Sequence, residues 1–305
     1  MKVFLTGATG FVGSYVSKAL LAAGHSIVCL IREGSEEKLD VRGREGVDVV
    51  VGSVTSGGPI YDQIEDCDAA IHLVGIIEEH PARGVTFENV HVEGTRFVVE
   101  QAKKAGIERF VHMSANGAKP QGKSEYQTTK WEAEHLVKNA GFAHWTIFRP
   151  SVIFGDPGEG RPEFVSQLAK TLVEPFPVLP VFGNGKYELQ PIHITTLADA
   201  FVQALSLPAA HGQIFFAGNR ERHTYVDVLD IITQALGLPE KSKIHTPLWL
   251  VRPAIETAGR VGLLPITPDQ FYMLIEGNTG NPDPFFATFD VTEVLFWHQS
   301  LNYLK

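Results

Sequence analysis

The first half of the chain alternates short apolar runs with longer segments whose apolar residues recur at helical spacing. The runs are nearly continuous in apolar residues instead of alternating with polar ones, which is typical of parallel strands covered on both faces. Strands are predicted at Val3–Leu5, Ile27–Ile31, Val47–Val51, Ala69–Val74, Arg109–Met113 and Trp145–Phe148. The alternation of strands and helices predicts an α/β fold with a doubly wound parallel sheet.

Helices are predicted at Gly13–Ala23, Glu88–Ala105 and Glu125–Ala140. Each is followed by a glycine that suits a helix C-terminus, and these glycines are Gly24, Gly106 and Gly141. The regularity fades after Pro150, where Gly, Pro and Phe become frequent. It returns in helical patterns at Thr196–Leu205 and Thr224–Leu236 and in a strand-like run at Ile214–Ala217.

This change in pattern predicts two interleaved units. The first spans residues 1–150, with residues 186–217 returning to it. A smaller lobe, predicted to hold the substrate, takes residues 151–185 and 218–305. The 305 residues are 44% hydrophobic, enough to bury a sizeable core.

Net charge and cysteine content restrict the partners and the compartment. Lys and Arg number 26 against 35 Asp and Glu, a formal charge of −9 that argues against nucleic acid as a partner. The two cysteines, Cys29 and Cys67, are interpreted as reduced. The apolar run at the start is too short for a signal peptide and no segment reaches the length of a membrane span, so we expect a cytoplasmic protein.

A glycine-rich loop follows the first predicted strand directly and opens the first helix. It reads Thr6-Gly-Ala-Thr-Gly-Phe-Val-Gly13. Gly7 permits the tight turn, Gly10 lets the backbone approach a pyrophosphate, and Gly13 lets the helix pack close to the strand. The helix N-terminus offers unpaired N–H groups to the phosphates. We therefore predict a Rossmann-type dinucleotide site at this loop.

The end of the second strand bears on which dinucleotide binds. An acidic residue at the strand tip would accept hydrogen bonds from the adenosine ribose of NAD, but here Arg32 follows the apolar strand. A guanidinium can pair with the 2′-phosphate of NADP. We favour NADP(H). The alternative is NAD(H), with Glu33 bonding the ribose and Arg32 solvated.

A tyrosine and a lysine lie four residues apart in the predicted helix after the fifth strand. Ser124 and Gln127 fit a capping box, which places Tyr126 and Lys130 on one face of the first turns. A neighbouring ammonium is expected to lower the pKa of the phenol, so that Tyr126 can act as an acid–base catalyst. The same ammonium can hold the nicotinamide ribose.

These motifs resemble those of the extended and atypical short-chain dehydrogenase/reductases. TGATGFVG, DAAIHLVG, HVEGT, EYQTTK, FRPSVIFG and LQPIHITTLADA stand in the family's order. The sequence of these motifs is most similar to the branch of the NADPH-binding accessory subunit of mitochondrial complex I and its bacterial relatives. The resemblance and the loop together imply these cofactor-binding residues: Gly7, Thr9, Gly10, Phe11, Val12, Gly13, Arg32, Ser53, Val54, Leu73, Val74, Gly75, Met113, Ser114, Tyr126, Lys130, Pro150, Ser151, Val152 and Ile153.

The chain departs from the family's catalytic set, which is usually Asn, Ser or Thr, Tyr and Lys. His91 stands where the family has Asn, and Ala115 stands where it has a hydroxyl residue. Losing an oxyanion-type donor lowers a rate by about 10²–10³, although Asn116 could supply an amide donor instead. Ser53 replaces an Asp that relatives often carry near the adenine. Residues expected near the substrate are Ile76, His91, Ala115, Asn116 and Phe154.

Two further features of the sequence bear on function. The histidines match no metal-ligand spacing and are expected to be packed and hydrogen-bonded, namely His72, His91, His112 and His193. Residues 247–265 form an amphipathic pattern, interpreted as a helix over the smaller lobe, with peripheral membrane contact the less favoured alternative.

Two functions follow. One is an oxidoreductase or epimerase/dehydratase-like enzyme acting by hydride transfer on an unknown small molecule. The other is a non-catalytic NADPH-binding structural or redox-sensing subunit of a larger assembly, as in complex I.

Overall fold

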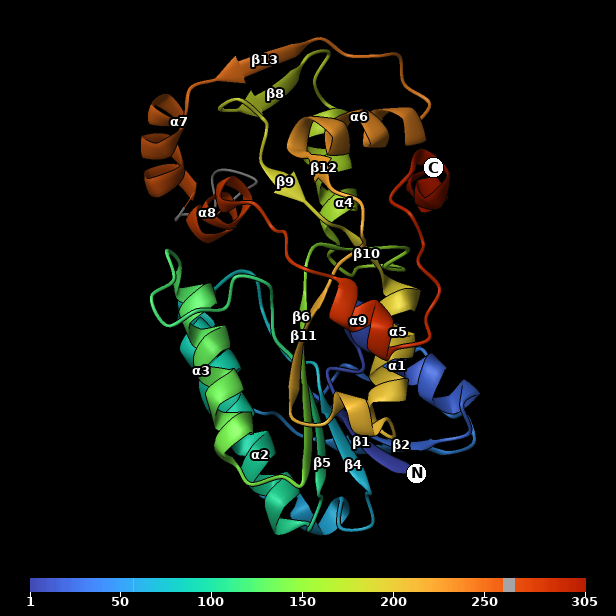
Figure 1. The fold of residues 1–305 in the computed structure, drawn as a ribbon. Coiled ribbons are helices and arrows are strands. Elements are labelled where there is room, and N and C mark those ends of the chain that lie inside the picture. The colour runs from blue at the N-terminus through green and yellow to red at the C-terminus, as the bar shows by residue number, and fades with distance from the viewer. Residues whose placement is uncertain (57, 260–266) are drawn as a thin grey trace.

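The computed structural model describes residues 1–56, 58–259 and 267–305. A parallel sheet flanked by helices forms one half of the molecule, and a smaller lobe stands over one end of the strands (Figure 1). The sheet has seven strands in the order β11-β6-β5-β4-β1-β2-β3, all pairing in parallel. They are β1 (Lys2–Thr6), β2 (Ser26–Ile31), β3 (Val47–Val51), β4 (Ala69–His72), β5 (Arg109–Met113), β6 (His144–Pro150) and β11 (Gln213–Ala217). The predicted doubly wound α/β fold is confirmed.

Helices cover both faces of the sheet. α1 (Phe11–Ala22) and α5 (Ile194–Ala204) pack on one face, and α2 (Gly94–Lys104) and α3 (Glu125–Asn139) on the other. The first three predicted helices end at glycines with φ of 78°, 76° and 72°, a left-handed conformation that glycine adopts without strain. The predicted helix at Glu88–Ala105 differs in one respect, because Glu88–Glu93 forms a π-helical turn before α2.

The smaller lobe has its own apolar core, which includes Phe154, Tyr225 and Phe296. Its helices are α4 (Phe164–Leu168), α6 (Tyr225–Ala235), α7 (Leu248–Ala254) and α8 (Pro268–Glu276), with π-helical turns at Ala169–Val173 and Ile255–Gly259. Short strands pair in this half: β7 (Ile153–Phe154) with β10 (Ile192–His193), β9 (Glu188–Leu189) with β12 (His223–Thr224), and β8 (Leu179–Phe182) with β13 (Lys243–Thr246). Single turns of 3-10 helix lie at Glu36–Lys38, Tyr61–Gln63, Pro81–Arg83 and Pro208–Ala210, and a longer one at His298–Leu304.

The C-terminal segment does not stay with the smaller lobe. α9 (Asp283–Thr288) returns to the sheet, where Phe285 and Phe289 pack against Phe148 of β6. The sequence pattern assigned all of residues 218–305 to the smaller lobe, because aromatic residues alone do not indicate which of two cores they enter.

The amphipathic segment 247–265 is only partly as predicted. Ile255 is buried, but Trp249 on α7 is 74% exposed, so the apolar residues do not all face the lobe. Arg260 and Leu263, which completed the predicted pattern, lie outside the described residues. Among the helices that the structure describes, none combines the length and the apolar character that a membrane crossing requires.

Candidate functional site

The predicted site residues gather at the carboxyl ends of the parallel strands. The phosphate loop follows β1, Arg32 follows β2, Ser53 and Val54 follow β3, and Leu73–Gly75 follow β4. Met113 and Ser114 stand at the end of β5, and Pro150–Ile153 continue from β6. Because these ends lie side by side in one sheet, distant parts of the sequence form a single edge, the place where open α/β sheets bind ligands.

The phosphate loop has the close backbone packing that its glycines predict. Gly7 has a φ of +82°, and its carbonyl accepts a 3.0 Å hydrogen bond from the N–H of Gly10. A Cβ on Gly13 would lie 2.0 Å from the Gly7 carbonyl oxygen, so only glycine fits there. The first i→i−4 bond of the helix runs from Ser14 to Gly10, and the N–H groups of residues 11–13 precede it. These groups fit the phosphates of a dinucleotide.

Two observations at the other end of this edge fit the binding of the nicotinamide half of a dinucleotide. A Cβ on Gly75 would lie 2.8 Å from Nζ of Lys130, which shows how closely the segment after β4 approaches this side chain. The hydroxyl of Ser114 is buried and has no hydrogen-bond partner among the described residues. A buried hydroxyl without a partner is costly, so a group bound at this position would satisfy it.

Arg32 is exposed at the end of β2, and its guanidinium makes no hydrogen bond or ion pair with any described residue. A cation at this place is open to an anionic ligand. The hydroxyl of Ser53 contacts that of Thr55 at 3.0 Å, and Val54 packs near the start of α2, where a Cβ on Gly94 would meet it at 3.1 Å. These residues lie together at the end of the edge where the sequence predicted the adenosine half of the cofactor.

Lys130 is almost completely buried and its Nζ donates a 3.2 Å hydrogen bond to the carbonyl of Met113. Burial lowers the pKa of Lys130 to about 8, and the nearby Glu134 carboxylate opposes that shift. The hydroxyl of Tyr126 makes no hydrogen bond with any described residue, and its ring packs edge-on against Phe87 and His91.

The expected lowering of the Tyr126 pKa is wrong for this structure. Burial raises the pKa of the phenol to about 12. The ring loses hydration between Phe87 and His91, and the Lys130 ammonium is directed to the Met113 carbonyl instead of the phenol.

The start of α3 is held from both halves of the molecule. Ser124 caps the helix and accepts from the N–H of Gln127, as predicted, but the Gln127 side chain accepts from the N–H of Lys123 instead of Ser124, so the capping box is incomplete. The side-chain amide of Gln127 also donates a 2.7 Å hydrogen bond to Glu276 of α8. The Asp269 carboxylate of α8 lies near the backbone N–H groups of Tyr126 and Glu125, which oppose the rise that burial causes in the pKa of Asp269. The helix that carries Tyr126 and Lys130 is therefore fixed by α8.

His91, which stands where the sequence analysis expected an asparagine, has hydrogen-bond partners at both ring nitrogens. One ring nitrogen lies 3.1 Å from both the N–H and the carbonyl of Ile76, and the other lies 3.0 Å from the Thr129 hydroxyl. Burial first, and then the charge of Lys130, lowers the pKa of His91 well below its usual value. A neutral His91 thus ties the segment after β4 to α3.

The proposed replacement donor, Asn116, is engaged within the chain. Its amide donates to the Asn278 side chain at 2.6 Å and to the Thr279 carbonyl at 3.2 Å. Ser151, a predicted cofactor residue, donates to the Asn278 carbonyl. Residues 278–279 thus lie against the ends of β5 and β6, beside Ala115.

Phe154 was expected near the substrate, and this is wrong. It is fully buried in the core of the smaller lobe, packed edge-on against His193 and Phe296. The pairing of β7 with β10 turns this side chain into the core, an arrangement that the sequence motif alone does not reveal.

A buried polar layer lies under α3 on the same face of the sheet. His72 bonds to the hydroxyls of Thr6 and Thr95 and stacks on His112 with ring centroids 5.3 Å apart. Both ring nitrogens of His112 lack a partner among the described residues, contrary to the expectation that all four histidines would be hydrogen-bonded. His193 does contact Thr195. No group of metal ligands is found in the described part of the chain.

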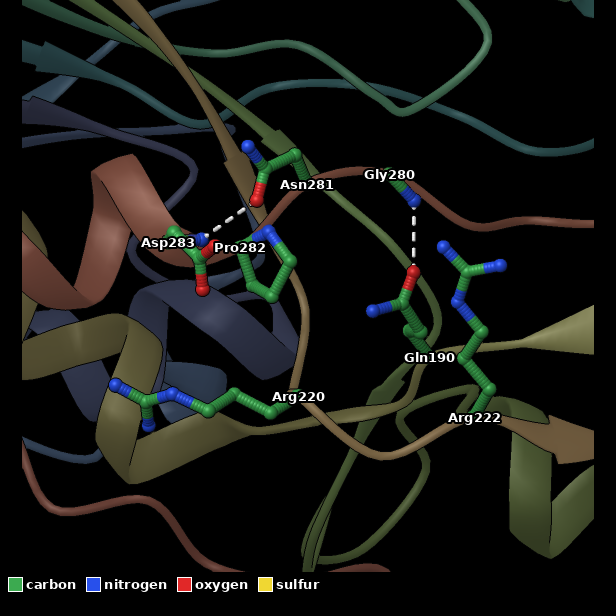
Figure 2. Close-up of a pocket in the computed structure, with 7 residues that line it drawn as sticks. All are labelled: Gln190, Arg220, Arg222, Gly280, Asn281, Pro282 and Asp283. Carbon is green, nitrogen blue, oxygen red and sulfur yellow. Dashed lines mark hydrogen bonds between the residues drawn. The ribbon is translucent and has the colours of Figure 1, made fainter.

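A separate pocket of about 350 Å³ is lined by residues 280–283 together with Gln190, Arg220 and Arg222 (Figure 2). Gln190 accepts from the Gly280 N–H across it at 2.7 Å. The two arginines that line it are paired with acids, Arg220 with Glu293 and Arg222 with Glu188. The sequence motifs did not indicate this pocket.

Other contacts around the site were also missed. Arg149 of β6 forms a bidentate pair with the buried Glu134 of α3. Arg161 of the smaller lobe contacts the phosphate loop through the Thr9 carbonyl. These pairs are 15 and 152 residues apart and follow no motif, so no sequence signal could have identified them.

Several known proteins are similar to this chain in sequence. The 40 kDa mitochondrial subunit of NADH-ubiquinone oxidoreductase of Neurospora crassa is 25% identical over 250 residues, covering 81% of this chain and 63% of that protein. A ceramide reductase of Caulobacter vibrioides is 28% identical over 84% of this chain and 76% of its own length.

Among solved structures, UDP-glucuronic acid 4-epimerase of Bacillus cereus, in complex with UDP-glucuronic acid and NAD, superposes with a TM-score of 0.75 at 18% identity. The match covers 100% of this chain and 99% of that one, and it shows the shared fold. The sequence model of the NAD dependent epimerase/dehydratase family matches residues 3–218, well over half of the chain. The chain therefore belongs to the NAD dependent epimerase/dehydratase family.

Proposed function

We propose that this protein is an NADP(H)-dependent oxidoreductase that interconverts a carbonyl compound and its alcohol, with Tyr126 and Lys130 as catalytic residues. The observation that carries the proposal is the position of Lys130. Its buried Nζ lies beside Gly75 and Met113, at the carboxyl edge that the phosphate loop also reaches. A buried lysine with a strongly shifted pKa at a ligand-binding edge is a mark of a functional site.

The residues support a simple division of labour. Bound NADPH supplies a hydride to the carbonyl carbon. Tyr126 donates its hydroxyl proton to the carbonyl oxygen, so the product is an alcohol and a phenolate remains. Lys130, with a pKa of about 8, keeps its proton at neutral pH, and its ammonium is proposed to turn from the Met113 carbonyl toward the negative charge as that charge forms. The raised pKa of Tyr126 keeps the phenol protonated and ready to donate before the reaction.

The preference for NADP(H) over NAD(H) rests on Arg32. An exposed guanidinium without a partner among the described residues suits a 2′-phosphate. Glu33 follows it, and NAD(H) with Glu33 on the ribose is the competing arrangement. The reducing direction is supported by the similarity to a ceramide reductase.

A second function is supported by the residues that were expected to lie near the substrate. Ala115 provides no hydroxyl, the Asn116 amide is engaged by residues 278–279, and His91 is engaged by Ile76. A protein with this arrangement could bind NADPH without turnover, as a structural or redox-sensing subunit of a larger assembly. The similarity to a subunit of NADH-ubiquinone oxidoreductase favours this candidate.

An assay of NADPH oxidation distinguishes the two functions. The purified protein is screened for NADPH oxidation with aliphatic, lipid-like and sugar-nucleotide carbonyl compounds, and the copurifying nucleotide is identified by mass spectrometry. The enzyme is expected to oxidise NADPH with at least one class, and Tyr126→Phe to lower kcat by about 10² or more with little change in nucleotide Kd. Unchanged kcat in Tyr126→Phe would remove its catalytic role. Tight NADPH binding with no oxidation in any class would favour the second function.

A further inference from the structure

Arg161 of the smaller lobe joins three segments around the adenosine half of the cofactor edge. Its Nε donates to the Thr9 carbonyl at 3.0 Å, within the phosphate loop. One Nη donates to the Lys38 carbonyl at 2.8 Å and to the Asp40 carboxylate, in the segment after β2. The other donates to the Pro157 carbonyl at 3.2 Å and reaches Asp40 at 3.5 Å. All five N–H donors of a guanidinium are thus used.

The surroundings of this side chain make the junction rigid. The Arg161 side chain is only 11% exposed, so its bonds are shielded from water. Asp40 also pairs with Lys18 of α1. Burial acts to raise the pKa of Asp40, but the hydrogen bonds from Arg161 and Lys18 outweigh it and the pKa is lowered, so Asp40 stays charged. The loop that carries Arg161 is anchored again where the Tyr15 hydroxyl donates to the Asp156 carbonyl.

The two nucleotide-side segments joined by Arg161 have distinct tasks. Thr9 lies between Gly7 and Gly10, in the loop that is to receive the pyrophosphate. Lys38 and Asp40 belong to the segment that begins at Arg32, where the adenosine ribose is to be recognised. The Lys18–Asp40 pair holds the ribose-side segment to α1, and Arg161 adds a direct link from that segment to the phosphate loop. Binding is tighter when the spacing of two such segments is fixed in advance.

We propose that Arg161 is a positioning residue for the cofactor, which holds the phosphate loop and the ribose-side segment at the spacing that an adenosine nucleotide requires. Because the residue belongs to the smaller lobe, it makes nucleotide affinity depend on how that lobe is attached. The inference rests on the proposed function in that it assumes a dinucleotide at this edge.

The test measures the Kd of NADPH and of ADP by calorimetry on the full chain. Arg161→Gln is expected to raise both values by about tenfold, since it removes charge-assisted bonds to all three segments. Arg161→Lys is expected to recover only part of the affinity, because one ammonium cannot span three segments. Arg42→Gln is the matched control: Arg42 pairs with Glu37 in the same segment, but both are exposed, and no change is expected.

The outcomes separate the inference from the proposed function. Wild-type protein that binds neither NADPH nor NADH would remove the proposed function, and the inference with it. Wild-type binding with unchanged affinity in Arg161→Gln, or wild-type affinity in Arg161→Lys, would overturn the inference alone. A rise in the Kd of NADPH without a rise for ADP would also overturn it, because the adenosine half would not be affected. Asp40→Asn, expected to raise both Kd values by less than Arg161→Gln, repeats the test if Arg161→Gln does not fold.

Discussion

The buried histidines under α3 predict a marked loss of stability in mild acid. His72, His91 and His112 are each no more than 1% exposed. Burial, followed by the charges of Lys130 and of neighbouring histidines, lowers their pKa values, that of His72 to about 3. An imidazole that stays neutral in the fold still accepts a proton near pH 6.5 when the chain unfolds. The unfolded state therefore binds more protons below pH 6.5, and stability falls as the pH falls through that value.

The size of this effect follows from the three side chains. Each neutral histidine is expected to lower the free energy of unfolding by about 1.4 kcal/mol between pH 7.5 and pH 5.5. The three together give about 4 kcal/mol, a large part of the 5–15 kcal/mol that typically stabilises a folded domain. Burial raises the pKa of Glu163 to about 7, which offsets part of this loss because the folded state takes up that proton first. The assay is denaturant unfolding followed by circular dichroism at pH 7.5, 6.5 and 5.5.

The variant His112→Leu tests the cause. Because both ring nitrogens of His112 lack partners among the described residues, its replacement is expected to be close to neutral at pH 7.5. The same variant is expected to reduce the acid-induced loss by about 1.4 kcal/mol. His80→Gln changes an exposed histidine and serves as the control. A wild-type loss under about 1.4 kcal/mol, or an undiminished loss in His112→Leu, would refute the reasoning.

Three further predictions concern the cofactor edge and its support. Gly13→Ala is expected to raise the NADPH Kd more than tenfold, because its Cβ would collide with the Gly7 carbonyl; Gly24→Ala, strained but in open space, is expected to lower stability by about 1 kcal/mol and leave the Kd unchanged. Arg32→Gln is expected to raise the NADPH Kd by about tenfold or more while the NADH Kd stays constant, and equal effects on both would favour the Glu33 arrangement. Glu134→Gln is expected to lower the free energy of unfolding by about 3 kcal/mol, since it leaves Arg149 without its carboxylate; Glu93→Gln, in the exposed pair with Arg96, is the control, and a similar cost in both would contradict the estimate.

The sheet and the cofactor edge could be predicted from the sequence because their signals are local. Continuous apolar runs indicated the strands. Gly10 and Gly13 pack against the backbone of Gly7, within six residues, and Gly7 itself has a φ of +82°. What could not be predicted depends on chain segments that meet only after folding. Phe154 enters a core formed with Phe296, and Arg161 reaches Thr9 across 152 positions. The pKa of Tyr126 belongs to this class too, because burial raises it and the lysine at helical spacing donates to the Met113 carbonyl.

The attachment of α8 to the first turn of α3 has a consequence for the proposed function. The Glu276 carboxylate accepts from the Gln127 side chain, and Asp269 lies near the backbone N–H groups of the turn that carries Tyr126. Any movement of α8 away from α3 must first break the bond between Gln127 and Glu276, and under the proposed function it would loosen the residue that donates the proton. If a reactant enters between α8 and α3, the proposed function therefore requires these contacts to re-form before proton transfer.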